Sequence, residues 1–222
     1  MSLISNSAGI LLGLLTLAVP PAYDVASPTA LTARTMVSAI MVSIGVVLSL
    51  RTPMVIKPKG PLLSSIEIAT VSVFSAIYAI AILMIVIPSP TGGYTHIGDV
   101  VVFTAALLFG YRVGGLVGII GAVVADLHTG YSRWFVSILA HGLEGAIAGL
   151  AKGRSLVFQV IMCIIGGFFM ASTYFLINIF IKEFPLAVIS YVRDLFAQVA
   201  VSMVLGIAIA NVIKRALPQL RE

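Results

Sequence analysis

Residues 155–181 read SLVFQVIMCIIGGFFMASTYFLINIFI, a run without any Asp, Glu, Lys or Arg. Because about 20 mainly apolar residues are enough for a helix to cross a bilayer, this run predicts a membrane-spanning helix. The rest of the chain agrees: 60% of its 222 residues are hydrophobic and only 9% are charged, with a mean hydropathy of +1.15. This composition indicates an integral membrane protein without a soluble catalytic domain.

Apolar runs bounded by Pro, Gly or charged residues predict eight helices. They lie at residues 6–20, 31–50, 62–87, 98–110, 113–127, 134–151, 155–181 and 185–213. The fourth and fifth runs are too short to cross a bilayer alone, so we expect them to be packed inside the bundle or to have recessed ends. The predicted fold class is all-α, a polytopic membrane helix bundle.

A Pro-rich, charged linker, RTPMVIKPKGP at residues 51–61, divides the chain. We predict an N-terminal extension over residues 1–60, made of two helices and this cytoplasmic linker, and a six-helix core over residues 61–222. The first apolar run has no basic residue ahead of it, which fits a retained helix better than a cleaved signal peptide.

Lys and Arg are distributed unevenly over the two sides of the predicted bundle. Nine lie on the side of the 51–61 linker, and four lie on the other side, namely Arg34, Arg133, Lys182 and Arg193. The positive-inside rule therefore places the linker and both termini in the cytoplasm of a cell-membrane protein. The loop 88–99 then faces outward, and the net charge of +5 reflects topology and not a nucleic-acid partner.

Several kinds of site are excluded by what the sequence lacks. The single cysteine, Cys163, excludes an intrachain disulfide and a Cys-rich metal site. The chain contains no phosphate-binding loop G-x-x-x-x-G-K-[ST], no G-x-S-x-G elbow and no H-E-x-x-H motif. Any work driven by ATP must therefore come from a partner chain.

Polar groups are costly inside a membrane unless they are paired or line a wet cavity, so the buried ones are informative. The stretch GGYTHIGD at residues 92–99 places Tyr94, His96 and Asp99 directly before an apolar run. One interpretation is a simple loop in which Asp99 caps the helix N-terminus. The other is a loop folded over an outward-facing ligand site.

A second cluster follows the fifth apolar run and contains Asp126, His128, Tyr131, Arg133 and Trp134. Trp and Tyr favour membrane interfaces whatever the function, and Arg133 can pair with Asp126. A carboxylate at a helix C-terminus is disfavoured by the helix dipole. We therefore expect that another group holds Asp126.

A third cluster forms a stripe along the predicted helix 134–151. Trp134, Ser137, His141, Glu144 and Ala148 are spaced 3, 4, 3 and 4 residues apart, which puts them on one helix face. His141 and Glu144 are then close enough to touch, either as a packing pair or as the wall of a pocket.

Weaker candidates lie on the last two helices and around the turn at Arg112. Tyr174 and Asn178 form an i, i+4 pair and Gln198 lies within the last run, although such groups also link helices. Gly114 and Gly118 have the spacing that permits close helix contact.

Four of these motifs, in this order, resemble those of the substrate-binding S components of energy-coupling factor (ECF) vitamin transporters. They are Tyr94-Thr-His-Ile-Gly-Asp99, then Ala105–Gly110 with Gly114-Gly115, then Gly121–Asp126 with Gly130-Tyr131 and Trp134, then Gly142-Leu-Glu-Gly145. The resemblance runs from about Leu62 to the C-terminus. The branch that it most resembles includes riboflavin, hydroxymethylpyrimidine and pantothenate carriers.

The resemblance implies a six-helix receptor that captures a vitamin or its precursor from outside, under the loop between its first two helices. It also implies that a T component and two cytosolic ATPases dock on the cytoplasmic side. In the family an A-x-x-x-A motif on the first helix meets the T component, and here Ser75 and Ala79 take those places. His141 stands where relatives often have a lysine, so the resemblance does not argue for an anionic substrate.

The leading hypothesis is a substrate-binding membrane subunit without catalytic residues, cofactor or resident metal. Its predicted site comprises Tyr94, His96, Asp99, Asp126, Tyr131, Trp134, Ser137, His141, Glu144, Asn178 and Gln198. A metal-ion carrier is the alternative, since imidazoles and carboxylates suit zinc, nickel or cobalt; it would use His96, His128, His141, Asp99, Asp126 and Glu144. A third hypothesis is an intramembrane enzyme with His141 and Glu144 as acid and base.

Overall fold

The computed structural model describes residues 63–85, 87–89, 91 and 93–220, so the two predicted N-terminal helices lie outside the described residues. The unit that begins at Ser65 is almost entirely helical. Its helices are α3 (Ser65–Met84), α4 (Asp99–Phe109), α5 (Tyr111–Thr129), α6 (Trp134–Gly149), α7 (Leu156–Ile181), α8 (Phe184–Arg193) and α9 (Val201–Ala216). The smaller elements are β1 (Ile87–Pro88), β2 (Tyr94–Thr95), the π-helical η1 (Asp194–Ala200) and the 3₁₀ turn η2 (Pro218–Leu220).

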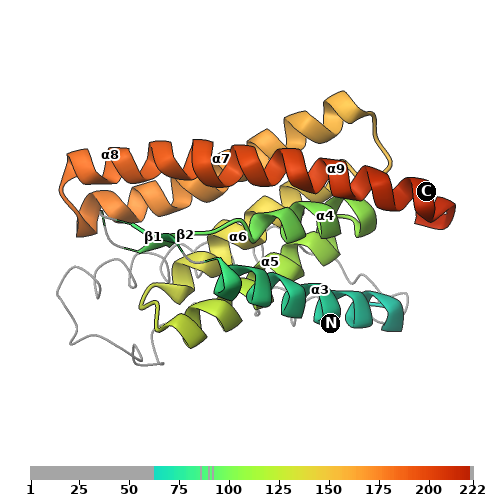
Figure 1. The fold of residues 1–222 in the computed structure, drawn as a ribbon, viewed down its shortest axis with the longest axis horizontal. Coiled ribbons are helices and arrows are strands. Elements are labelled where there is room, and N and C mark those ends of the chain that lie inside the picture. The colour runs from blue at the N-terminus through green and yellow to red at the C-terminus, as the bar shows by residue number, and fades with distance from the viewer. Residues whose placement is uncertain (1–62, 86, 90, 92, 221–222) are drawn as a thin grey trace, which may run out of the picture. The chain divides into compact units, whose positions relative to one another are not determined.

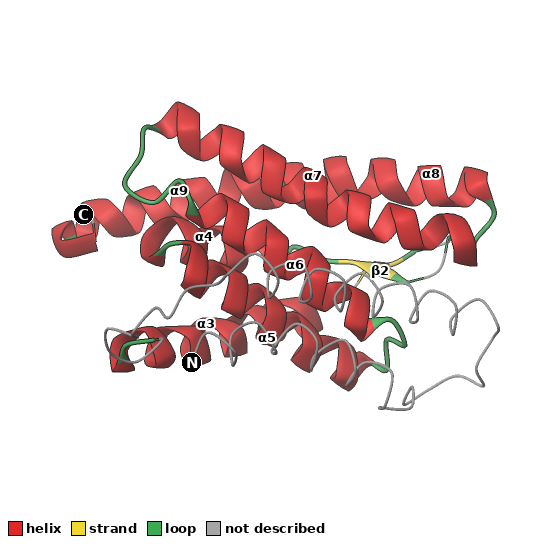
Figure 2. Cartoon of the chain, turned by 180° about the vertical axis from the view of Figure 1, so that it is seen from behind, coloured by secondary structure: helices red, strands yellow, loops and turns green. Residues whose placement is uncertain are grey.

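The described helices form the six-helix bundle that the sequence predicts. The π-helical turn η1 joins α8 to α9, so that one helix runs from Phe184 to Ala216. Figure 1 shows this long helix beside α7, with α3 and α5 on the opposite side and α4 and α6 between them. The view from behind, Figure 2, shows the same order. The antiparallel hairpin of β1 and β2 lies between α3 and α4 in sequence.

Four described helices are long and apolar enough to cross a membrane: α3, α5, α7 and the helix of α8 and α9. The fourth predicted run is short, as expected, and forms the 11 residues of α4. The prediction for the fifth run is wrong, because α5 has 19 residues and reaches Thr129. The helix ends there because Gly130 adopts a left-handed conformation, with φ at 71°, and its N–H bonds to the Asp126 carbonyl. The second short helix is instead α6, with 16 residues.

The contact between α5 and α6 depends on glycine. A Cβ atom on Gly118 would lie 2.2 Å from the His141 carbonyl oxygen, and one on Gly145 would lie 2.1 Å from the Gly114 carbonyl oxygen. Neither distance allows a side chain without moving a backbone. The glycines therefore let the two helices touch through their main chains, which fixes the height of His141 in the bundle.

Replacing Gly118 or Gly145 by alanine should lower the free energy of unfolding by about 1–3 kcal/mol, because the two backbones must separate. Gly115→Ala is the matched control, since its Cβ would lie 3.3 Å from the nearest atoms of Ala146 and Gly142 and needs only a small adjustment. Thermal unfolding in detergent measures the difference. Equal losses in the three variants would contradict the close contact.

Candidate functional site

A pocket opens at the end of the bundle where the hairpin, the turn between α5 and α6, and the junction of α7 with α8 meet. Its cavity volume is about 40 Å³, and the hollow together with the open space at its mouth takes in about 500 Å³. Apart from Gly93, only Ile82 and Ala122 line it with apolar side chains. The remaining lining residues are Tyr94, His96, Asp126, Tyr131, Arg133, His141, Tyr174, Asn178, Lys182, Arg193, Asp194 and Gln198. The hollow is thus polar, in a bundle whose outer faces expose Ile, Val, Leu and Phe.

Behind the pocket, the fully buried carboxylate of Asp99 connects four helical elements. The Tyr78 hydroxyl on α3 donates to Asp99 Oδ1 at 2.8 Å, and the Gln198 amide on η1 donates to Asp99 Oδ2 at 2.7 Å. The His141 Nδ1 atom on α6 lies 3.2 Å from Asp99 Oδ1. Asp99 itself is the first residue of α4, and the N-cap is Gly98, which has no side chain to cap with. The interpretation of Asp99 as a simple N-cap is therefore wrong, because its carboxylate is used inside the bundle.

His141 lies between two carboxyl groups. Its Nδ1 atom is 3.0 Å from Glu144 Oε2 and 3.2 Å from Asp99 Oδ1. The nitrogen carries at most one hydrogen, so it can donate to both carboxyl groups only through one bifurcated hydrogen bond. The other carboxyl oxygen of Glu144 is buried and has no hydrogen-bond partner among the described residues. His141 lines the pocket, and the two carboxyl groups lie behind it.

The loop that carries His96 lies against the same site. The Gly98 N–H donates to His96 Nδ1 at 3.2 Å, and the centroid of the His96 ring is 5.7 Å from those of Tyr94 and His141. Burial lowers the pKa of His96 to about 4, so this imidazole is neutral at physiological pH. The loop covers the pocket without adding a charge to it.

Asp126 is held by hydroxyl groups. It accepts hydrogen bonds from the hydroxyls of Tyr94 and Ser137, and the Ser137 oxygen also bonds to the Tyr174 hydroxyl at 2.6 Å. These bonds explain how a carboxylate is tolerated at the C-terminus of α5. The expected alternative, a pair between Arg133 and Asp126, is not formed, because Arg133 Nη1 donates to Asn178 Oδ1 at 3.3 Å.

The predicted site residues fall into three groups. Seven line the pocket: Tyr94, His96, Asp126, Tyr131, His141, Asn178 and Gln198. Three lie behind its wall and bond to lining residues: Asp99, Ser137 and Glu144. The half-buried Trp134 has its ring beside Phe135, and it is not among the residues that line the pocket.

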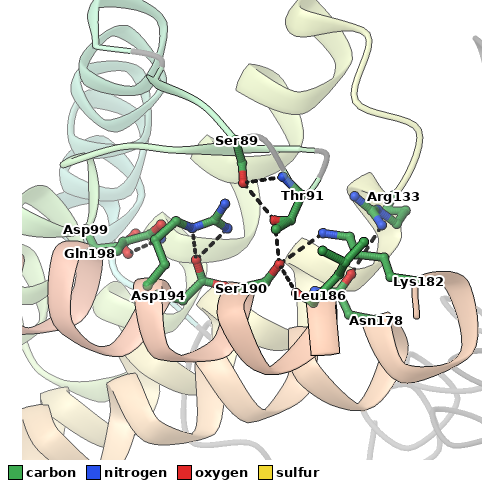
Figure 3. A network of polar contacts seen from close by, with 11 residues as sticks. Ser89, Thr91, Asp99, Arg133, Asn178, Lys182, Leu186, Ser190, Asp194 and Gln198 are labelled. Atoms are coloured by element: carbon green, nitrogen blue, oxygen red, sulfur yellow. Dashed lines mark hydrogen bonds and ion pairs between the residues drawn. The ribbon is translucent and has the colours of Figure 1, made fainter. Parts of the chain in front are cut away.

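The predicted site omitted five polar residues that line the pocket: Arg133, Tyr174, Lys182, Arg193 and Asp194. Figure 3 shows Arg133, Asn178 and Lys182 at one end of a polar network and Asp99 with Gln198 at the other. The network reaches across the π-helical turn η1, an irregularity that often occurs at functional sites. The signal for the cations was present in the sequence, because they are basic residues on the side that the positive-inside rule depletes.

Part of this cluster has donor atoms suited to a metal ion. His96, Asp99 and His141 each offer one such atom, and the three atoms lie within 4.8 Å of one another. Nitrogen and carboxylate donors of this kind suit first-row transition metals. The six residues of the metal-carrier hypothesis do not converge, since His128 is exposed and Asp126 is bonded to Tyr94 and Ser137.

Tyr78→Phe should lower the free energy of unfolding by about 1–3 kcal/mol, because it removes a donor from a buried carboxylate. Tyr111→Phe is the matched control, since Tyr111 is 49% exposed and its hydroxyl bonds only at the surface, to Arg112; we expect a change within about 0.5 kcal/mol. Thermal unfolding of both variants in detergent makes the comparison. Similar unfolding temperatures for the two variants would contradict the conclusion that the hydrogen bond from Tyr78 to Asp99 stabilises the bundle.

Several known proteins are similar to this chain over part of its length. A family model described as "ECF-type riboflavin transporter, S component" matches residues 62–216. The thiamine precursor transporter HmpT of Lactococcus lactis is 35% identical over 85 residues, which cover 37% of this chain and 51% of that protein. A UPF0397 protein of Streptococcus pneumoniae is 32% identical over 87 residues, or 39% of this chain and 47% of that protein.

A third relative, an uncharacterized protein of Pyrococcus woesei, is 27% identical over 144 residues, which cover 63% of this chain and 96% of that protein. The chain spans only about half the length of HmpT and of the UPF0397 protein. The family model nevertheless extends over more than half of the chain, from the start of the described bundle to the end of α9. The chain therefore belongs to the family of S components of ECF-type riboflavin transporters.

Proposed function

We propose that this chain is the membrane-embedded substrate-binding subunit of an ECF-type uptake transporter for a vitamin or vitamin precursor. Riboflavin, a hydroxymethylpyrimidine precursor of thiamine, and pantothenate are the candidate classes. A T component and two cytosolic ATPases would dock on the cytoplasmic side, with both termini of the chain on that side. The polar pocket at the opposite end of an otherwise apolar bundle is the observation that carries the proposal.

The pocket has the features of a small-molecule site. Its rings, which include Tyr94, Tyr131 and Tyr174, offer faces for a planar heterocycle, and its amides and imidazoles offer donors and acceptors for the ring edge. Asn178 and Gln198 reach it from α7 and η1, and His141 reaches it from α6. The name of the relative HmpT, a thiamine precursor transporter, supports a substrate of this kind. The family gives no support to the hypothesis of an enzyme.

Protein purified in mild detergent should retain an organic ligand that mass spectrometry identifies as a vitamin or precursor. His141→Ala and Glu144→Ala should lower the ligand content at least several-fold, because the first removes a lining side chain and the second a group that holds it. His128→Ala is the matched control, since this histidine is exposed at the end of α5. Unchanged ligand content in both pocket variants would contradict the proposed site.

The proximity of His96, Asp99 and His141 keeps a metal-ion substrate as the second candidate. Elemental analysis of the same purified protein distinguishes the two. Zinc, nickel or cobalt near one ion per chain, lost in His96→Ala and without an organic ligand, would favour the metal carrier. Metal far below one ion per chain, together with a retained vitamin, would exclude it.

The docking residues implied by the family motif need correction. Ser75 and Ala79 are each only 4% exposed, and the main chain of Ser75 contacts α5 so closely that a Cβ on Gly121 would lie 2.9 Å from its carbonyl oxygen. Because both residues face into the bundle, a T component cannot reach them. Two exposed pairs of small residues on α3 have the same spacing, Ser65 with Ala69 and Ser72 with Ala76. We propose the second pair as the docking site, because it lies beside the motif positions.

The double variant Ser72→Leu with Ala76→Leu should reduce co-purification of a co-expressed T component, because the larger side chains prevent close helix contact. Its ligand content should remain normal. Ala208→Leu provides the control, as an equal enlargement of an exposed alanine on α9. Full retention of the T component by the double variant would rule out this pair.

A further inference from the structure

The basic residues of the described bundle are divided between its two ends. Arg112, Lys152, Arg154, Lys214 and Arg215 lie at the end opposite the hairpin, near the start of α5, the end of α6 and the end of α9. At the hairpin end there are only three among the described residues: Arg133, Lys182 and Arg193. All three line the pocket. We call them the rim cations.

The rim cations come from three separate parts of the chain. Arg133 precedes α6, Lys182 follows α7 and Arg193 ends α8. Burial, followed by the charges of the two arginines, lowers the pKa of Lys182 to about 8. Three positive charges brought together in this way repel one another, so their convergence costs stability. A bound anion would offset that cost.

Both arginines have donor groups that the protein does not use. The Nε atom of Arg133 and the Nη1 atom of Arg193 are buried and have no hydrogen-bond partner among the described residues. Other donors of the two arginines are in use. Arg133 Nη1 donates to Asn178 Oδ1 at 3.3 Å, and Arg193 donates to Asp194 Oδ1 through Nη2 at 2.7 Å and through Nε at 3.0 Å. Buried donors without partners are costly, so these two groups are available to acceptors that a bound ligand or water brings into the pocket.

The carboxylates nearby offset only part of the charge of the rim cations. Asp194 pairs with Arg193. Asp126 also belongs to the pocket, where it accepts hydrogen bonds from Tyr94 and Ser137, and its charge still acts on Arg133. The neutral His96 adds no charge. Because three cations face two carboxylates in the lining, the mouth of the pocket keeps an excess of positive charge.

We propose that the rim cations bind an anionic group of the substrate, a carboxylate or a phosphate, at the mouth of the pocket while its uncharged part lies deeper among the tyrosines and imidazoles. This inference rests on the proposed function and narrows its substrate class. Guanidinium groups match the planar geometry of carboxylate and phosphate oxygens and form charge-assisted hydrogen bonds with them. His141 contributes nothing to this recognition, since it is held at the inner end by Asp99 and Glu144.

Three matched pairs of probes test the proposal: pantothenol with pantothenate, hydroxymethylpyrimidine with its phosphate, and riboflavin with flavin mononucleotide. In each pair the second member adds an anionic group to nearly the same scaffold. Ligand-free protein should bind the anionic member of one pair about 10- to 100-fold more tightly than the neutral member, as isothermal titration measures. The pair that binds also distinguishes carboxylate from phosphate.

Arg133→Gln should remove most of that preference, because the anionic member of the pair should lose much more affinity than the neutral member. Arg154→Gln is the matched control, since this exposed arginine lies at the other end of the bundle. Arg193→Lys serves as a second variant that keeps the charge beside Asp194; it should weaken binding of the anion less than Arg133→Gln does.

A pH series gives a readout that does not depend on removing a side chain. The facing groups of Lys182 are Arg133, Arg193 and Asp194, and the two arginines stay charged at every pH used. Lys182 is charged below its pKa of about 8 and neutral above it, so affinity for the anionic probe should fall between pH 7 and pH 9. Lys182→Arg should remain charged and abolish most of that fall.

The outcomes of these experiments distinguish failure of the anionic subsite from failure of the proposed vitamin receptor. Equal or tighter binding of the neutral member, or a preference that survives Arg133→Gln, overturns the anionic subsite and leaves the vitamin receptor in place. Binding of none of the six probes overturns the proposed function in these classes and the anionic subsite with it. An anionic preference lost in Arg133→Gln and kept in Arg154→Gln supports both.

Discussion

The buried carboxylate of Asp99 is the constraint on which the rest of the site depends. A charge-bearing group cannot remain at bilayer depth without partners, and here its partners come from three other elements: Tyr78 of α3, Gln198 of η1 and His141 of α6. Satisfying one carboxylate therefore orients four helical elements toward a single point. Because His141 and Gln198 bond to Asp99 and also line the pocket, the same contacts form the inner wall of the pocket.

The glycines of α5 and α6 make this convergence compatible with dense packing. Gly118 lets the main chain of α5 approach the His141 carbonyl, so His141 is positioned by backbone contact on one side and by two carboxyl groups on the other. Several contacts thus fix the position of His141 at the pocket floor. The rim, in contrast, is built from the ends of helices and from a loop, where specificity can change without disturbing the bundle.

The sequence predicted the bundle and much of the pocket because both follow from local patterns. Apolar runs revealed the helices, and the spacing of Ser137, His141 and Glu144 revealed one inward face of α6. The long-range partners were harder, since nothing local links Tyr78 or Gln198 to Asp99. The rim cations were missed for a different reason: Lys182 and Arg193 were interpreted only as topological charges, and Arg133 was considered only as such a charge or as a partner for Asp126. Spacing alone does not say which face of α3 meets the bundle, so the burial of Ser75 and Ala79 could not be predicted from the motif.

Access of water-soluble molecules from outside tests the central claim, that these polar groups surround a single hollow open to the exterior. The most direct measurement labels Tyr131→Cys in a Cys163→Ala background with a membrane-impermeant maleimide, since Tyr131 lines the pocket and is half-buried. Ala106→Cys is the control, because Ala106 is fully buried in the core. The account predicts labelling of Cys at position 131 from the outer side alone and none at position 106. Labelling from the cytoplasmic side, or equal protection at the two positions, would contradict it.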